Sequence, residues 1–204
     1  MEVIQNNNTD PQGENLSVWG YFVRCITKKY SDFSGRARRK EWWSLALFEL
    51  LIVSLLSIPV VRTFGKDFAA DPEIAQYMAQ NPGDMEYVYS LLGSNVFFWV
   101  LVIVGILLLV PTLAVGCRRF HDVGISTGVF WVVGVLTVLS SIVGVLIVIV
   151  PEVIPMALTG IISFLSLIAS LAMLVIAFIP GKVGPNAYGP DPKPAPTYEG
   201  YGQI

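Results

Sequence analysis

Two arginines, the single histidine of the chain and an aspartate lie close together, at Arg118, Arg119, His121 and Asp122. A histidine beside a carboxylate can form a general base, and clustered arginines suit the oxygens of phosphates and carboxylates. A long apolar stretch ends directly before Arg118, and another begins a few residues after Asp122. We therefore expect these side chains to lie in a turn between two membrane spans.

Two other segments carry polar residues of the same kind. One precedes the first apolar stretch and is rich in arginine, and the other is rich in Gly and Pro and lies near the C-terminus. The sequence predicts that all three segments meet at one membrane face, where they form a candidate binding cluster. Its members are Arg36, Arg38, Arg39, Arg118, Arg119, His121, Asp122, Asn186 and Asp191.

Glu49 interrupts the first apolar stretch about two helical turns past Trp42 and Trp43. An ionised acid deep in a membrane costs about 3 kcal/mol on insertion scales. Glu49 can face the interior of a helix bundle, or it can be a shallow residue that reaches the interface or pairs with a nearby arginine. We favour the second interpretation because Glu49 does not lie at mid-depth.

Enzymatic chemistry has little support in this sequence. No nucleophile stands at a diagnostic spacing from His121, and one histidine without a cysteine pair is poor evidence for a metal site. Phosphate-loop, dinucleotide and zinc-protease motifs are absent from the sequence. Cys25 and Cys117 fit small apolar filling positions. We predict no catalytic residue, no metal and no cofactor.

The composition is that of a membrane protein, with 14% charged and 54% hydrophobic residues. An ordinary soluble domain has roughly 25% charged residues. The apolar residues are gathered in long runs, which indicates an all-α membrane protein with four transmembrane helices. The expected spans are residues 44–61, 92–115, 129–150 and 155–179.

The segments outside the spans also have distinct patterns. Residues 1–15 resemble a mobile tail without the pattern of a secretory signal, and residues 181–204 form a Gly/Pro-rich tail. Between them, residues 16–180 make the membrane domain. It begins with an amphipathic helix that can lie in the headgroup region or pack on the bundle. Residues 62–90 form a polar, net acidic loop.

Helix caps can also be predicted. Asp32 or Ser34 can cap the helix that leads into the first span, and Asp84 the helix that leads into the second. Asp71, followed by Pro72, predicts the start of a short helix inside the loop.

Lysine and arginine are distributed unevenly between the two sides of the predicted bundle. The segment before the first span is rich in cations, whereas the loop at residues 62–90 has only Arg62 and Lys66. By the positive-inside rule both termini and the Arg118–Asp122 stretch are cytoplasmic.

Three motifs carry a resemblance to a known family. They are Asp32-Phe33-Ser34-Gly35-Arg36-Ala37-Arg38-Arg39-Lys40-Glu41-Trp42-Trp43, Arg118-Arg119-Phe120-His121-Asp122-Val123-Gly124 with Ser126, and Gly184-Pro185-Asn186-Ala187-Tyr188-Gly189-Pro190-Asp191-Pro192. The chain resembles the DUF805 family of bacterial inner-membrane proteins over most of its length. The resemblance implies a small multi-span protein of the cytoplasmic membrane and no assigned activity. The family usually continues as Ser-Gly-Trp, whereas here Thr127-Gly128 follows Ser126, so the start of the third span can differ in register.

Two interpretations of the cytoplasmic cluster remain open. In the first, Asp122 and Asp32 pair with arginines, His121 bonds a backbone carbonyl, and the tail docks under the bundle. In the second, the arginines bind an anion, most simply a lipid phosphate. We expect a non-enzymatic protein that binds anionic lipid headgroups, a partner protein or a second copy of itself, and not nucleic acid. The alternative is an oligomeric transporter of a small solute or ion.

Overall fold

A computed structural model describes residues 16–81, 85–151 and 154–193 of the 204-residue chain. Within these residues the regular structure is helical, apart from one isolated bridge between Asn186 and Gly189. Four helices are long and apolar enough to cross a membrane, which confirms the predicted all-α fold with four transmembrane helices. The predictions for residues 1–15 and for Asp84 lie outside the described residues.

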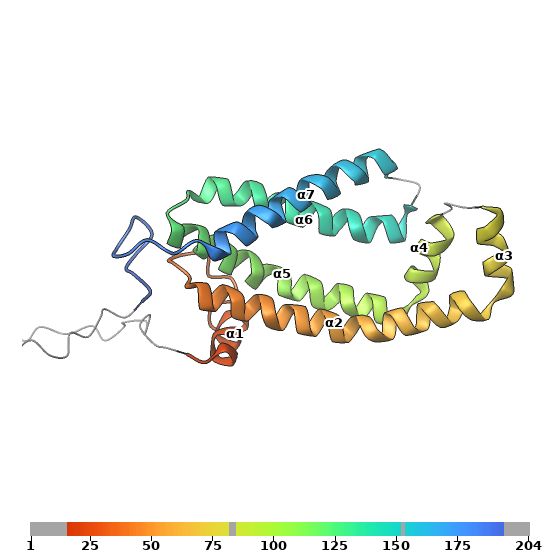
Figure 1. Cartoon of the computed structure of the whole chain (residues 1–204), viewed down its shortest axis with the longest axis horizontal. Coiled ribbons are helices and arrows are strands. Elements are labelled where there is room, and N and C mark those ends of the chain that lie inside the picture. The colour runs from red at the N-terminus through yellow and green to blue at the C-terminus, as the bar shows by residue number, and fades with distance from the viewer. Residues whose placement is uncertain (1–15, 82–84, 152–153, 194–204) are drawn as a thin grey trace, which may run out of the picture.

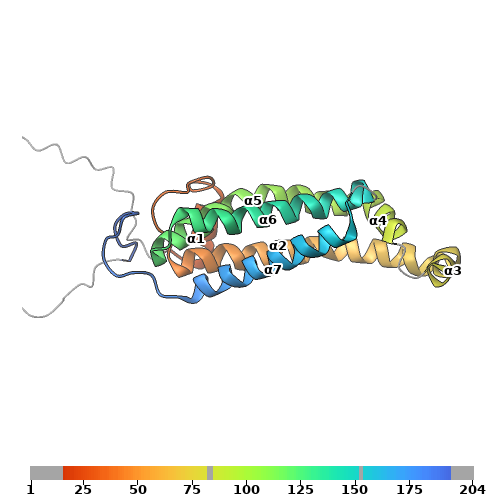
Figure 2. The same ribbon diagram turned by 90° about the horizontal axis from the view of Figure 1, so that it is seen from above.

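The four long helices lie side by side as a bundle (Figures 1 and 2). Helix α2 contacts α5 and α7, and α6 contacts the same two helices from the other side. Large apolar side chains cover the outside of the bundle, as expected for helices that face lipid. The helix bounds are α2 Arg39–Ala70, α5 Val96–Val123, α6 Thr127–Ile149 and α7 Met156–Phe178.

The predicted polar loop at residues 62–90 is largely helical. Helix α2 continues to Ala70, and two short helices follow, α3 Pro72–Gln80 and α4 Met85–Ser94. The side chain of Asp71 accepts a hydrogen bond from the Glu73 backbone N–H at 2.8 Å, and Pro72 is the first helical residue. The predicted start of this short helix is therefore confirmed.

The second span begins later than the apolar pattern predicts. The chain breaks between α4 and α5 at Asn95, whose side-chain oxygen accepts from the backbone N–H groups of Phe97 and Phe98. Its amide group also donates to the Thr63 hydroxyl on α2. One buried asparagine thus ends one helix and caps the next inside the predicted second span, where Gly93, Ser94 and Asn95 interrupt the apolar residues.

The Arg118–Asp122 stretch is helical, and the expected turn lies just beyond it. Helix α5 ends at Gly124, which has the left-handed backbone angle φ 84°. The N–H of Gly124 bonds the carbonyls of Phe120 and His121, and the N–H of Ile125 bonds Phe120. This glycine C-cap fixes the direction of the last turn of α5, and so of the charged side chains on it.

The N-terminal helix α1, Val18–Ile26, packs against α2 and α5. Phe22 and Cys25 are buried against Leu45 and Val115. On its outer side Trp19 is 58% exposed. The side chain of Tyr30, beyond this helix, donates to the Leu107 carbonyl at 2.7 Å. That carbonyl lacks its usual helical partner because Pro111 has no N–H.

The predicted cap of α2 by Asp32 or Ser34 is wrong. Arg38 occupies the N-cap position. Asp32 instead accepts from the backbone N–H of Ser34 at 3.0 Å, which closes a local turn. Asparagine and aspartate favour such turns as much as helix caps, so the residue type alone does not separate the two roles.

Candidate functional site

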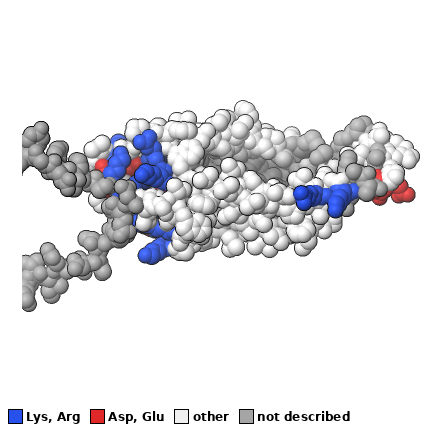
Figure 3. Space-filling model, turned by 60° about the horizontal axis from the view of Figure 1, so that its bottom comes forward, with Lys and Arg blue, Asp and Glu red and all other residues white. Residues whose placement is uncertain are grey.

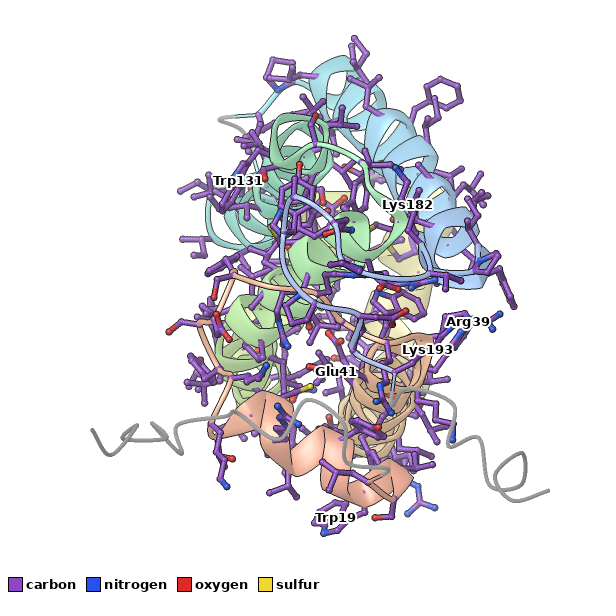
Figure 4. All side chains as sticks on the ribbon, turned by 90° about the vertical axis from the view of Figure 1, so that its left-hand side faces the viewer. Trp19, Arg39, Glu41, Trp131, Lys182 and Lys193 are labelled. Carbon is purple, nitrogen blue, oxygen red and sulfur yellow. The ribbon has the colours of Figure 1, made fainter. Side chains whose placement is uncertain are left out.

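The three charged segments meet at the end of the bundle that carries α1. Figure 4 looks onto this end, where the segment after α7 passes over the helix ends and returns toward the start of α2. Glu41 points into the space between α1, α2 and α5, whereas Trp19 points outward. We call Arg36, Glu41, Arg118, Arg119 and Asp122 the charge cluster. All five side chains are buried.

Asp122 is the centre of one half of the charge cluster. Its Oδ1 accepts from Arg36 Nε at 3.0 Å and lies 2.9 Å from Arg36 Nη2, so two nitrogens of the guanidinium face one carboxylate oxygen. Its Oδ2 accepts from Arg119, which lies one turn earlier on α5. Both arginines also donate to backbone carbonyls beyond α7: Arg119 to Ile179, and Arg36 to Lys182 and Gly184.

Arg118 and Glu41 form the other half. The pair is joined at 2.5 Å between Arg118 Nη1 and Glu41 Oε1, and Arg118 is 0% exposed. The Cys25 thiol also donates to Glu41 Oε1 at 3.7 Å. Arg118 Nε and Nη2 and Arg119 Nε have no hydrogen-bond partner among the described residues. Arg118 therefore depends on one carboxylate for its neutralisation.

Cys25 is kept protonated by this environment. Burial and the nearby negative charge of Glu41 raise the pKa of the thiol to about 12, although Arg118 acts in the opposite direction. Because the thiolate is the reactive form, Cys25 is unreactive near neutral pH. It is a packing residue, as its apolar character predicts.

The segment after α7 is held by hydrogen bonds to α5 and to itself. The Lys182 N–H donates to the Asp122 carbonyl at 2.9 Å, and the Asn186 side chain donates to the His121 carbonyl at 2.9 Å. The carboxylate of Asp191 accepts from the N–H groups of Gly184 and Lys193. Burial alone would raise the pKa of Asp191, but these N–H groups and nearby cations hold it below its usual value. Asp191 thus shapes the docked segment and interacts electrostatically with Arg36 of the charge cluster.

His121 is oriented by neutral groups. Its Nδ1 lies 3.0 Å from the Gly35 carbonyl and its Nε2 lies 2.8 Å from the Thr127 hydroxyl. A carbonyl can only accept, so Nδ1 carries the proton and Nε2 accepts from Thr127. The ring of Tyr188 stacks on the imidazole with 4.0 Å between centroids. Asp122 binds arginines instead of this ring, so the two neighbours in sequence do not form a general base.

The remaining predicted residues lie at the edge of the cluster or away from it. Arg38 is buried and donates to the Pro192 carbonyl and to the Tyr21 hydroxyl. Arg39 is exposed and donates to the Phe178 carbonyl at 3.4 Å. Asp32 lies 3.9 Å from Lys29, and against the effect of burial the charges of Arg118 and Lys29 both act to lower the pKa of its carboxyl group. Glu49 accepts from the Thr112 hydroxyl inside the bundle.

Gly181 is required by the close approach of the tail to Asp122. A Cβ atom added at Gly181 would lie 2.0 Å from Asp122 Oδ2 and 2.5 Å from its Cγ. The carboxylate cannot move aside because two arginines hold it. We expect Gly181→Ala to lower the free energy of unfolding by about 1–3 kcal/mol, as overpacking does.

Unfolding of purified protein by SDS in mixed micelles measures this loss. Gly184→Ala provides a comparison. A Cβ added at Gly184 meets no atom within 4 Å, so a loss of stability there comes from the backbone angle φ of 80° and not from a steric clash. Equal stability of Gly181→Ala and the wild type would show that the tail does not approach Asp122 this closely.

Comparison with known proteins identifies the family. The family described as "Protein of unknown function (DUF805)" matches residues 30–190. The chain belongs to the DUF805 family. This DUF805 chain is 26% identical over 171 residues to "Inner membrane protein YhaH" of Escherichia coli K12, a match that covers 84% of this chain and 95% of the relative. The protein of the same name from Escherichia coli O157:H7 matches to the same extent. No solved structure matches.

The DUF805 match covers the first two motifs and the third as far as Pro190, and the relatives are inner-membrane proteins. Together with the four apolar helices, this makes the chain a multi-pass inner-membrane protein of a family without an assigned function. Sequence reasoning on this DUF805 chain missed Glu41 as the partner of Arg118. The available signal was one acid that follows four cations within a few residues.

Proposed function

We propose that this DUF805 protein binds anionic phospholipid headgroups at the end of the bundle that carries α1, without enzymatic activity. The site is a basic recess beside the charge cluster, and both termini lie in the cytoplasm. A phosphate is the anion expected there, because a lipid headgroup is the most abundant phosphate at a membrane face.

One observation carries the proposal: a small recess at this end, of about 10 Å³, is lined by four cationic side chains and one acid, so a headgroup phosphate can bind at its rim. The acid, Glu41, is bound to Arg118, while Arg36 pairs with Asp122 and Lys29 lies 3.9 Å from Asp32. The lining residues are Tyr21, Arg24, Lys29, Arg36, Arg38, Glu41 and Pro192. Arginine and lysine near a membrane surface attract anionic lipid by about 1 kcal/mol each.

The charge cluster supports this site indirectly. It contains three guanidinium groups and two carboxylates, all buried, and backbone carbonyls accept further hydrogen bonds from Arg36 and Arg119. Arg36 belongs to both the cluster and the recess lining, and its bonds to Asp122 and Gly184 fix its position. The internal ion pairs therefore hold the recess in shape, while Arg24 and Lys29 are half-buried at its edge.

The surroundings of the recess suit a membrane boundary. Trp19 and Trp43 are partly exposed at this end of the bundle, where tryptophan is enriched at headgroup level. In Figure 3 the visible lysine and arginine side chains gather at the two ends, and the long stretch between them is uncharged. Sequence counts place more cations before α2 than in residues 62–90, which supports a cytoplasmic position for the recess. A reporter inserted after residue 75 should then be extracytoplasmic, and a cytoplasmic reporter would contradict this orientation.

The full-length protein in a neutral detergent provides the binding test. Phosphatidylglycerol should bind more tightly than phosphatidylcholine, and native mass spectrometry counts the retained lipids. Arg24→Gln combined with Lys29→Gln should weaken phosphatidylglycerol binding roughly 30-fold, since each cation contributes about 1 kcal/mol. The matched control is Arg62→Gln with Lys66→Gln at the opposite end, which should leave binding unchanged.

Equal effects of the two double variants would mean that lipid binding is a general charge effect and would reject the recess. Retention of a protein in place of phosphatidylglycerol would favour a partner protein as the occupant of this end.

A further inference from the structure

Glu49 lies where two intramembrane cavities meet. One cavity of about 240 Å³ is bordered by α2, α5, α6 and α7, and another of about 500 Å³ lies mainly between α5 and α6. Glu49, Thr112 and Thr137 line both. This geometry corresponds to the interior-facing interpretation of Glu49, not to a residue that pairs with an arginine.

Glu49 is the only titratable side chain among the residues that line the two cavities. Within the described part of the chain it makes no ion pair, and its hydrogen-bond partner is the Thr112 hydroxyl at 3.0 Å. That hydroxyl also lies 2.8 Å from the Leu108 carbonyl. It has one hydrogen and cannot donate to both oxygens at once. The carboxylate therefore lacks a full set of protein donors in a medium where an unpaired charge is costly.

The other hydroxyl groups that line the cavities donate their hydrogens to backbone carbonyls. Thr137 donates to the Val133 carbonyl, Ser141 to the Thr137 carbonyl and Ser170 to the Ser166 carbonyl. The cavities thus present a carboxylate and hydroxyl lone pairs, which are acceptors, on otherwise apolar walls. An anion finds no cationic partner among the lining residues, whereas a positive charge meets the Glu49 carboxylate.

The larger cavity is accessible from the lipid side of the bundle. Ile106 and Ile142, which line it, are 61% and 48% exposed on the bundle surface. Gly105 also lines it, and a Cβ added there would meet no atom within 4 Å. A hydrophobic molecule dissolved in the bilayer can therefore enter between α5 and α6 and reach Glu49.

We propose that this intramembrane site binds a lipophilic monocation, whose apolar body fills the larger cavity and whose charge is neutralised by Glu49. The volume is within the range of small-molecule sites in proteins, roughly 300–1,000 Å³. A lipid acyl chain would fill the same space but would leave the carboxylate unpaired. This site is separate from the basic recess and does not depend on it.

Tetraphenylphosphonium and tetraphenylborate, which share a shape and differ in the sign of their charge, form a matched pair of probes. Equilibrium dialysis against the full-length protein in a neutral detergent, corrected for empty micelles, measures both. Tetraphenylphosphonium should bind and tetraphenylborate should not. Glu49→Gln should weaken tetraphenylphosphonium binding more than roughly 30-fold, as expected when one partner of a buried charge pair is removed. Glu73→Gln, outside the cavities, should leave it unchanged.

A second pair of variants tests the cavity without altering Glu49. Gly105→Leu fills the larger cavity and should also abolish binding, whereas Gly144→Leu, at an equally open position outside the lining, should not. Equal binding of the two probes, or a Glu49→Gln affinity within twofold of the wild type, would overturn the proposal. Glu49→Gln should retain as much phosphatidylglycerol as the wild type. The proposal for the cavity site and the proposal for the basic recess are therefore tested independently.

Discussion

Asp122→Asn will lower the free energy of unfolding by about 3–5 kcal/mol, the usual cost of removing one partner from a buried ion pair. Asparagine has nearly the shape of aspartate, so the loss comes from charge and not from a cavity. Arg36 and Arg119, which are 4% and 1% exposed, would remain charged without a carboxylate. Unfolding by SDS in mixed micelles measures the change.

Asp32→Asn is the control for this substitution. Asp32 is partly exposed and lies 3.9 Å from Lys29, so its pairing contributes at most about 1 kcal/mol. Asp122→Asn should also increase proteolysis near residues 181–184, because Arg36 and Asp122 both hold that segment. Similar small losses in the two variants would show that Asp122 does not neutralise the arginines.

Glu41→Gln should have a comparable effect, a loss of about 3–5 kcal/mol in the free energy of unfolding. Arg118 is fully buried, and two of its nitrogens lack partners among the described residues. Without the Glu41 carboxylate its charge has no counterion within hydrogen-bonding distance in the described part of the chain. The same unfolding measurement applies, with Glu73→Gln as an exposed control.

The double variant Glu41→Leu with Arg118→Met separates charge from packing. Apolar residues of similar volume often replace a buried ion pair without loss of stability. We expect the double variant to unfold within about 1 kcal/mol of the wild type, well above either single variant. Additive losses would show that the pair stabilises the bundle through packing and hydrogen bonds instead.

Much of this arrangement could be predicted from residue types. Long apolar runs predicted the membrane helices. The docked segment, with the contact of Asn186 to His121, agrees with the structural interpretation of the cluster. The pairing of Asp122 with arginines and the His121 contact to a backbone carbonyl agree with it as well. These features follow from the charges of the side chains and from the low dielectric of the membrane. Both can be inferred from the residue types in the sequence.

Other features depend on how helices are placed relative to one another. Arg118 and Arg119 are adjacent in sequence, yet they point to different acids, Glu41 and Asp122, because successive helical residues face different directions. The cavities beside Glu49 arise from the packing of four helices and leave no periodic signal. The break at Asn95 rests on one side chain. These features can be seen only in the three-dimensional structure.

The tail contacts also set an order of events during synthesis. Arg36 bonds carbonyls 146 and 148 residues later in the chain, so its partners are made long after α2 and α5. Chains are synthesised from the N-terminus, and the first helices enter the membrane before residues 181–192 exist. During that interval the arginine N–H groups at the bundle end lack those carbonyl acceptors. A newly made chain therefore leaves these hydrogen bonds unformed until its last segment docks, and docking marks completion of the bundle.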